Sequence, residues 1–213
     1  MAELINPLAE NYARKFTSPE DELLSEIARF TNSHHPHAQM LSGHVQGKLL
    51  EMISCMVNPI RILEIGTFTG YSALCLAKGL QSNGILHTIE LRDSDAETAA
   101  GYFMKSLNYN KIILHKGDAV SIIPTLEETW DIIFIDADKT GYINYYELTL
   151  PRLRKNGLMI ADNVLFHGEV LEDNISGKNA LAIDAFNEHV AGDERVEQLI
   201  LTVRDGLLLI RKL

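Results

Sequence analysis

Three oxygen-bearing side chains follow two short apolar runs of the sequence, at the points where the runs end. Asp136 follows the run 132–135, and Asp162 and Asn163 follow the run 158–161. If the two runs are neighbouring strands, about 4.8 Å apart, these side chains can converge on one point. Two carboxylates and an amide suit a hard cation that completes its shell with other oxygens. The pattern favours a Mg²⁺ site over a zinc site, with Ca²⁺ and Mn²⁺ as alternatives.

Lys139 lies three residues after Asp136, close enough to face the same site. The alternative is a solvated surface lysine, which is the commoner fate of this residue type, just as the acids could cap helices or lie in solvated loops. Next to a divalent cation, however, the ammonium form is disfavoured, and an amine with a depressed pKa can act as a general base. We therefore predict that Lys139 is the catalytic base.

The segment 62–72, ILEIGTFTGYS, joins an apolar run to a glycine-bearing turn and then to a helical pattern. Gly66 and Gly70 tolerate positive φ and let a ligand approach the backbone. Phosphate-binding loops favour bare N–H groups, whereas Glu64 places a carboxylate at the end of the predicted strand. This favours a cationic ligand such as the amino group of S-adenosylmethionine. An NAD or FAD site is a weaker alternative, because Phe68 fills the middle position of the required G-x-G-x-x-G.

Two further strand ends carry polar residues. Glu90 ends the second predicted strand, where a carboxylate can accept hydrogen bonds from ribose hydroxyls, and Gly117-Asp118-Ala119 ends the third, where a polar loop can receive an adenine edge. Each signal is weak alone, because glycine turns and strand-end acids are common. Since ligands of open α/β sheets bind beyond the carboxyl ends of the strands, the three loops together predict an adenosine pocket.

A sheet must bring these side chains together, and the hydrophobic pattern predicts one. Apolar runs alternate with helical patterns, which predicts parallel strands with right-handed crossovers, a doubly wound α/β sheet covered on both faces. A tight turn at Arg204-Asp205-Gly206 between two more runs predicts an antiparallel C-terminal hairpin. The expected strands are 60–65, 85–89, 112–114, 132–135, 158–161, 196–203 and 207–210, and the expected helices between and after them are 70–81, 93–107, 118–128, 141–154 and 178–190.

Two helices are expected before the first strand. A serine cap, a proline and three acids at 18–22 predict the start of a helix that runs to about residue 32. Apolar residues that recur on one face between Val45 and Met56 predict the second helix.

The 213 residues are near the size of one domain, and 46% of them are hydrophobic, enough for a sizeable core. A net charge of −10 argues against broad binding to nucleic acid or anionic membrane. The N-terminus lacks the apolar core of a signal peptide, and no apolar run approaches the roughly 20 residues of a membrane span. We therefore expect a single-domain, soluble, cytoplasmic protein.

Cys55 and Cys75 lie among apolar residues at helical spacing, so we expect both to be reduced core residues.

The motifs LEIGTFTGYS, IDADK and ADNV, with the C-terminal RVEQLILTVRDGLLLIRKL, resemble the cation-dependent, S-adenosylmethionine-dependent O-methyltransferases of the caffeoyl-CoA and catechol type. The similarity extends from about Met40 to the C-terminus, and the joint spacing of DADK and DN makes it specific. It implies a seven-stranded sheet with an antiparallel last strand, in a homodimer. It also implies a metal site at Asp136, Asp162 and Asn163, a base at Lys139, and cofactor contacts from Ser42, Glu64, Gly66, Thr67, Ser72, Glu90, Ala119 and Asp136.

By the same resemblance, the helical segment 1–40 shapes substrate choice. It contains three histidines, whose spacing matches no standard zinc signature, so a polar loop is favoured over a metal site: His34, His35 and His37. His167, just after the Asn163 loop, is a candidate for substrate contact.

The expected reaction is methyl transfer to a hydroxyl of a catechol-like diphenol or phenylpropanoid, with the metal lowering the phenol pKa and Lys139 removing the proton. One alternative is methylation of a hydroxylated uridine in tRNA, as in relatives with this fold, but that needs a basic surface and the net charge counts against it. A cofactor-binding protein without catalysis is a third, which the metal constellation disfavours.

Overall fold

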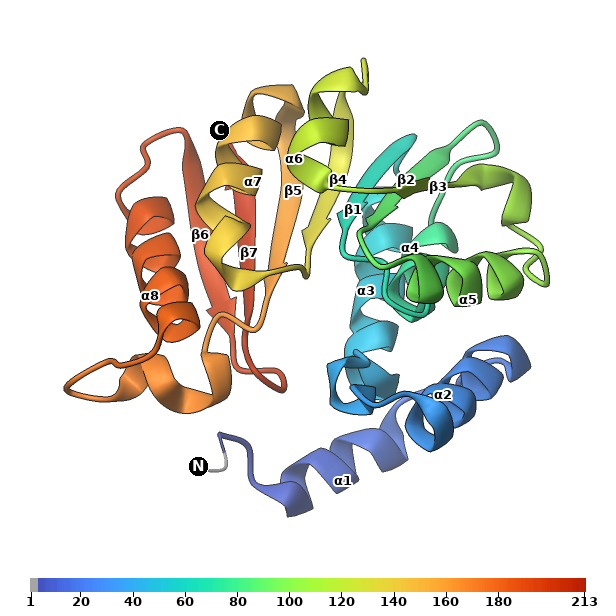
Figure 1. Ribbon diagram of the computed structural model, residues 1–213, viewed down its shortest axis with the longest axis horizontal. Coiled ribbons are helices and arrows are strands. Elements are labelled where there is room, and N and C mark those ends of the chain that lie inside the picture. Colours follow the sequence, from blue (N-terminus) through green and yellow to red (C-terminus); the bar gives the residue numbers. More distant parts are fainter. Residues whose placement is uncertain (1–3) are drawn as a thin grey trace.

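The computed structural model describes residues 4–213, which form a seven-stranded sheet between two layers of helices (Figure 1). Five strands pair in parallel in the order β3-β2-β1-β4-β5, and β7 then pairs antiparallel with both β5 and β6. The predicted doubly wound sheet and the C-terminal hairpin are therefore confirmed. The strands are β1 (Arg61–Ile65), β2 (Ile85–Glu90), β3 (Ile112–Lys116), β4 (Trp130–Ile135), β5 (Leu153–Asp162), β6 (Val196–Leu201) and β7 (Leu207–Lys212).

The α-helices of the described residues are α1 (Pro7–Phe16), α2 (Glu22–His34), α3 (Gly43–Val57), α4 (Tyr71–Ala77), α5 (Asp93–Phe103), α6 (Ala119–Ile122), α7 (Tyr142–Thr149) and α8 (Lys178–Ala191). Short 3-10 turns lie between them, at η1 (Ala38–Met40), η2 (Tyr109–Lys111), η3 (Ile123–Thr125), η4 (Lys139–Gly141), η5 (Leu150–Arg152) and η6 (Phe166–Leu171).

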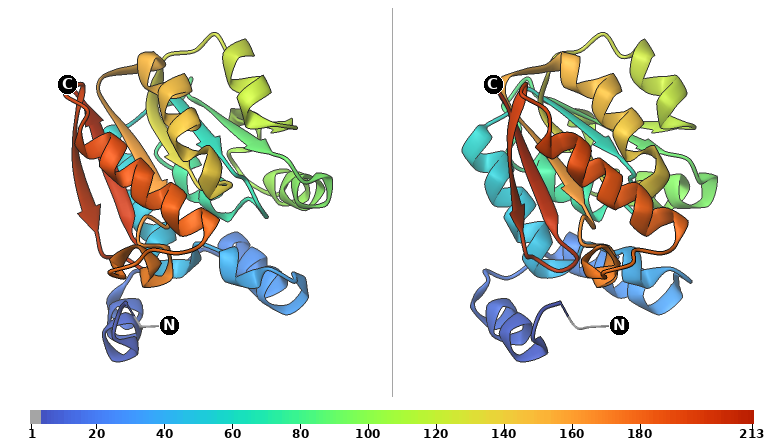
Figure 2. Two further views of the ribbon diagram at one scale, coloured as in Figure 1. Left: turned by 60° about the vertical axis from the view of Figure 1, so that its left-hand side comes forward. Right: turned by 90° about the vertical axis from the view of Figure 1, so that its left-hand side faces the viewer.

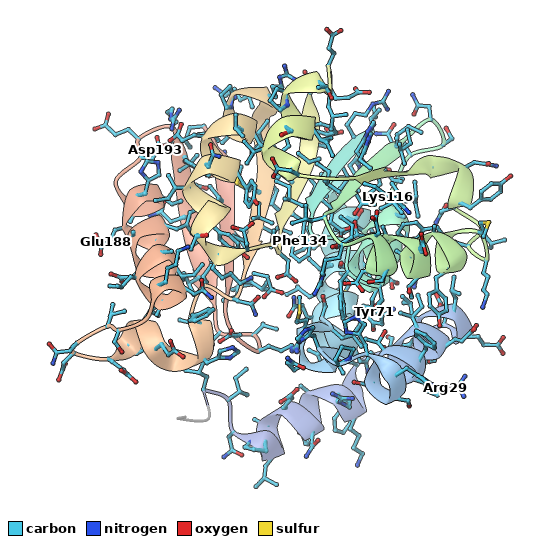
Figure 3. The ribbon with its side chains drawn as sticks, in the orientation of Figure 1. Arg29, Tyr71, Lys116, Phe134, Glu188 and Asp193 are labelled. Atoms are coloured by element: carbon cyan, nitrogen blue, oxygen red, sulfur yellow. The ribbon has the colours of Figure 1, made fainter. Side chains whose placement is uncertain are left out.

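The two faces of the sheet pack against different helices. Successive strand residues point to opposite faces, so Leu63 joins a core with α6, α7 and α8, whereas Ile62 joins a second core with α2, α3, α4 and α5. Figure 2 shows this division, with α7 and α8 on one side of the sheet and α3 on the other. Phe134 lies near the centre of the molecule, whereas Glu188 and Asp193 lie at its edge (Figure 3). Burial on both faces explains the continuous apolar runs of β1 and β4.

The N-terminal helices differ from the sequence prediction. Helix α1 was not expected, and it buries none of its residues. Helix α2 begins at Glu22, after Asp21 rather than Ser18, because the Asp21 carboxylate accepts a hydrogen bond from the Leu24 N–H at 2.9 Å and so caps the helix.

Two central helices are shorter than predicted. The expected helix 118–128 is α-helical only to Ile122, and the expected helix 141–154 only to Thr149. Pro124 and Pro151 lie in the 3-10 turns that follow, and proline cannot donate the hydrogen bond that would continue an α-helix. Strand β5 consequently begins at Leu153, five residues before its predicted start.

The prediction that both cysteines lie in the core is wrong for Cys55. Cys75 is buried in α4, but Cys55 is exposed on α3, because the side of α3 that packs against the core carries Leu50, Ile53 and Ser54. Within residues 4–213, no helix has the length and apolar character needed to cross a membrane.

Candidate active site

A cavity of about 560 Å³ lies at the carboxyl ends of the parallel strands. The ends of β1, β2, β4 and β5 and the loop after β3 contribute to its wall. Helices α1 and α2 and the segment 163–177 lie at this end of the molecule in each view (Figures 1 and 2). The predicted site residues that line the cavity are Gly66, Glu90, Ala119, Asp136, Lys139, Asp162, Asn163 and His167.

The structure brings the predicted metal ligands together with Lys139. Strands β4 and β5 are parallel neighbours with Ile135 opposite Ala161, so that Asp136 and Asp162 follow at adjacent strand ends. The Lys139 ammonium lies between these ends and donates to Asp136 Oδ1 at 3.1 Å and to Asn163 Oδ1 at 2.8 Å. The carboxylate and amide oxygens therefore face one point, and a cation, here the ammonium, lies among them.

Asp162 is buried and held by two donors. Its Oδ1 accepts the Asn163 N–H at 2.7 Å, and its Oδ2 accepts a side-chain N–H of Gln46 at 2.5 Å. Burial and the nearby charge of Asp136 raise the pKa of Asp162 to about 7, although Lys139 and Gln46 act in the opposite direction. A further positive charge at this point would favour the ionised carboxylate.

The Lys139 side chain is almost fully enclosed, and its ammonium group donates to the Tyr142 hydroxyl. Burial alone lowers the pKa of Lys139, but the Tyr142 hydroxyl and the carboxylates of Asp136 and Asp162 outweigh this effect and raise the pKa above its ordinary value. The Tyr142 hydroxyl accepts from Lys139 at 2.7 Å and donates to the Asp162 carbonyl at 3.0 Å. Lys139 is thus a cation as long as the two carboxylates are not neutralised by another charge.

The turn after β1 passes very close to the end of β4. The backbone N–H of Asp136 donates to the Ile65 carbonyl at 2.9 Å, and a Cβ built on Gly66 would lie 1.9 Å from the Asp136 carbonyl oxygen. Gly66 also has a φ of +99°, which favours glycine. No other residue type fits at this position without moving the Asp136 backbone.

Glu64 lies behind this turn rather than in the cavity wall. It is fully buried, the Thr88 hydroxyl donates to its Oε2, and its Oε1 has no hydrogen-bond partner among the described residues. Burial raises the pKa of Glu64 to about 8. A buried carboxylate oxygen without a donor fits a cationic group of a ligand.

Glu90 is oriented by the two loops beside it. Its carboxylate accepts the Phe68 N–H at 2.7 Å and the Arg92 N–H at 2.9 Å. The Gly117 N–H donates to the Glu90 carbonyl at 2.9 Å and brings the loop after β3 alongside. The three loops predicted to form an adenosine pocket therefore meet at one wall of the cavity.

Not every predicted cofactor residue reaches this cavity. Thr67 and Ser72 are buried, and the Thr67 and Thr88 hydroxyls lie 2.5 Å apart. Ser42 lines a smaller neighbouring cavity of about 240 Å³ between α1, α2 and the start of α3. Thr67, Ser72 and Glu64 are thus buried outside the lining of the main cavity, and Ser42 belongs to the smaller one.

The loop that follows Asn163 carries unusual backbone. Asn163, Phe166 and His167 all have positive φ, between 40° and 58°. Asp205, in the turn between β6 and β7, accepts the His167 backbone N–H at 2.5 Å, and its Oδ2 lies 3.5 Å from His167 Nδ1. The turn therefore fixes the half-exposed His167 ring at the rim of the cavity.

The three N-terminal histidines do not form a common site. His34 is the last residue of α2 and bonds to the Phe30 carbonyl, whereas His35 Nε2 lies 3.0 Å from Asp95 Oδ1 and packs edge-on against Phe68. His35 thus supports the loop beside Glu90.

Sequence reasoning missed Tyr142, Gln46 and Arg204. Tyr142 lies three residues after Lys139, and that helical spacing could have indicated it. Gln46 is separated from Asp162 by 116 residues and Arg204 from Gln46 by 158, so only the fold reveals these contacts.

The comparisons with known proteins show the family of this chain. A family model described as O-methyltransferase matches residues 14–213. The chain belongs to the O-methyltransferase family. The match includes α2 and so begins well before Met40, the expected start of the resemblance.

The O-methyltransferase has relatives along nearly its whole length. It is 32% identical over 209 residues to "Probable caffeoyl-CoA O-methyltransferase 2" of Dictyostelium discoideum, with 95% of this chain and 90% of that protein covered. It superposes on the O-methyltransferase TomG from Streptomyces achromogenes, solved in complex with SAM, with a TM-score of 0.86, 31% identity and 96% of each chain covered. For SAH-bound PaMTH1 of Podospora anserina the TM-score is 0.88, with 29% identity and 97% and 94% covered.

Proposed function

We propose that this O-methyltransferase transfers a methyl group from S-adenosylmethionine to a hydroxyl of a catechol-like small molecule, an ortho-diphenol or a phenylpropanoid, with the help of a divalent cation. The observation that carries the proposal is the cluster at the ends of β4 and β5, where Lys139 contacts Asp136 and Asn163 and lies close enough to Asp162 to feel its charge. The names and bound ligands of the relatives agree with it.

The donor site is the wall formed by the loops after β1, β2 and β3. Glu64 lies behind Gly66, and a cationic group of the donor nearby would favour its ionised form and give the unpartnered Oε1 a partner, with Thr67, Ser72 and Ser42 as further support. Glu90 offers its carboxylate to ribose hydroxyls, and Ala119 lies where the adenine would pack. Asp136 borders both this wall and the metal cluster.

The residues present fit a hard divalent cation. Asp136 and Asp162 supply carboxylate oxygens and Asn163 an amide oxygen, which is the donor set that Mg²⁺, Mn²⁺ or Ca²⁺ prefers. The pKa of Asp162 is also raised, and a nearby positive charge would lower it. When bound, such a cation would supply the charge that lowers the pKa of a diphenol hydroxyl from about 10.

Lys139 is the proposed base. With a cation held by Asp136 and Asp162, these carboxylates would no longer favour the ammonium form, so Lys139 would release a proton to solvent and its neutral Nζ could accept the phenol proton. The phenolate oxygen attacks the methyl carbon, the carbon–sulfur bond breaks, and its electron pair stays on the sulfur of S-adenosylhomocysteine. Tyr142 holds Lys139 in place during the reaction. The orientation of the reacting groups then supplies much of the acceleration of methyl transfer.

We further propose that the segment 1–40 borders the acceptor and that the protein is a homodimer. Gln39 and Met40 line the main cavity, and Gln39 also lines the smaller one, next to α1 and α2. Met52 and Met56 on α3 and Leu199 on β6 are large apolar side chains exposed on the molecular surface. Exposed apolar groups of this kind are typical of protein interfaces.

The function is tested by incubating the protein with the methyl donor and caffeate or 3,4-dihydroxybenzoate, with added Mg²⁺ and with EDTA. We expect methylated diphenol with Mg²⁺ and a loss of turnover with EDTA. Turnover that EDTA leaves unchanged would remove the cation from the proposal. Methylation of tRNA but of no diphenol would replace the small-molecule acceptor by a hydroxylated uridine.

A further inference from the structure

Gln46 occupies an unusual position for an amide side chain. It lies on α3, 116 residues from Asp162 in sequence, and is completely buried. Its Nε2 donates to Asp162 Oδ2 at 2.5 Å, and its Oε1 lies 3.5 Å from Nη1 of Arg204. The side chain therefore bridges a predicted metal ligand and a guanidinium.

Arg204 and the Asp162 carboxylate together determine which way the Gln46 amide points. A guanidinium can only donate hydrogen bonds, so the amide oxygen faces it and the NH₂ group faces the opposite way, toward Asp162. With the amide reversed, the NH₂ group would meet the guanidinium and the amide oxygen would meet the carboxylate, and both contacts are repulsive. The charge of Arg204 thus ensures that Asp162 receives a donor.

The Asp162 carboxylate has no freedom left to rotate. Oδ1 accepts the Asn163 backbone N–H and Oδ2 accepts a side-chain N–H of Gln46, so each oxygen is held by its own donor. A ligand held in this way keeps its remaining lone pairs aimed at a fixed point, which reduces the cost of ordering it when a cation binds.

Arg204 is itself held at the junction of three segments. It donates to the carbonyls of Leu41, at 2.8 Å, and of Ser42, just before α3. Its own turn between β6 and β7 accepts backbone N–H groups of Val164 and Leu165, in the loop after the metal ligands. The guanidinium is therefore held by the segment before α3 and by its own turn, which is bonded to the loop after the metal ligands.

We propose that Gln46, oriented by Arg204, is a positioning residue that holds the Asp162 carboxylate for the divalent cation. This inference rests on the proposed cation-dependent function. It assigns a role in cation affinity to the N-terminal part of α3 and to the β6–β7 turn.

The test is Gln46→Met, which keeps the volume and removes the donor. Mn²⁺ binding to the whole protein is measured by titration calorimetry and by electron spin resonance of free Mn²⁺, without methyl donor. Because partners behind a metal ligand typically contribute about 10- to 100-fold in affinity, we expect a weakening in that range. S-adenosylmethionine binding should not change, and turnover should be restored by raising the Mn²⁺ concentration. Gln198→Leu, an exposed glutamine on β6, is the control.

Arg204→Met gives a second, independent measurement if Gln46→Met folds poorly. It leaves Gln46 in place but removes the guanidinium that faces the amide oxygen, so the amide is held at one end only. Mn²⁺ should then bind more weakly, and Arg204→Lys should recover part of the loss. Wild-type affinity in a folded Gln46→Met or Arg204→Met variant overturns the positioning role. Absence of Mn²⁺ binding to the unaltered protein overturns the cation-dependent function itself, which is a separate result.

Discussion

The absence of a Cβ at Gly66 lets the turn after β1 approach the backbone of Asp136 in the metal cluster. A methyl group at this position would collide with the carbonyl of Asp136, and the positive φ adds strain of its own. We expect Gly66→Ala to lower the free energy of unfolding by about 3 kcal/mol, because overpacking and backbone strain each contribute. Urea denaturation measures this change.

Gly101 is the matched control for that substitution. It lies within α5, and nothing lies within 4 Å of a Cβ built there. Gly101→Ala should therefore stabilise the protein by about 0.5–1 kcal/mol. Equal effects of the two substitutions would contradict the close approach at Gly66.

Lys139 gives the prediction for catalysis at the residue scale. Lys139→Met removes the base but leaves the metal ligands, so kcat for a diphenol should fall by about 10²- to 10⁴-fold. Calorimetry should show unchanged binding of the methyl donor. Lys155→Met, at an exposed position on β5, is the control, and full turnover in Lys139→Met would exclude the base role.

The site residues that could be predicted are those that end strands. Asp136, Asp162 and Asn163 follow apolar runs, and parallel pairing brings such positions together whatever the rest of the chain does. Gln46 and Arg204 could not be found in this way, because a buried glutamine on a helix and an arginine in a turn carry no periodic signal. Their contacts depend on how α3 and the β6–β7 turn pack.

At the scale of elements, the alternation of apolar runs with helical patterns predicted the strands better than it predicted the ends of the helices. Strands β1 and β4 are buried on both faces, so their apolar runs stand out. Helix α1 was not predicted, and its large apolar side chains Leu8, Tyr12 and Phe16 are exposed rather than packed in either core. The ends of α6 and α7 depend on Pro124 and Pro151, whose effect as helix breakers could have been anticipated.

Strands β2 and β3 carry a histidine pair that makes stability depend on pH. His87 Nδ1 lies 3.0 Å from His115 Nε2, and the rings are stacked. Burial lowers the pKa of both residues, and the nearby charge of His115 lowers that of His87 further. Because the folded pKa values lie below the unfolded value of about 6.5, this stability is complete above that pH and is lost as the pH falls below it.

Urea unfolding at about pH 8 and about pH 5.5 measures this loss. In His115→Gln the decrease toward acid pH should be smaller than in the unaltered protein, whereas His34→Gln, at an exposed position, should leave it unchanged. An equal decrease in His115→Gln would show that other groups cause it.

At the scale of the whole molecule, the two helical layers leave apolar surface on α3 and β6. If a second copy covers it, Met52→Glu and Leu199→Glu should each convert a dimer to a monomer in light scattering, because a buried unpaired charge is costly. Leu107→Glu, at a fully exposed site, should have no effect. A monomer before any substitution would contradict the homodimer.

The placement of Cys55 provides a direct probe of that assembly. Its thiol is exposed on α3 between Met52 and Met56, whereas Cys75 is buried and its pKa is raised by burial, so that it stays unreactive. A maleimide should therefore modify one position without any mutagenesis. The rate of that modification should fall with protein concentration if two copies associate through α3, and a spin label at the same sulfur would report on the helix that carries Gln46.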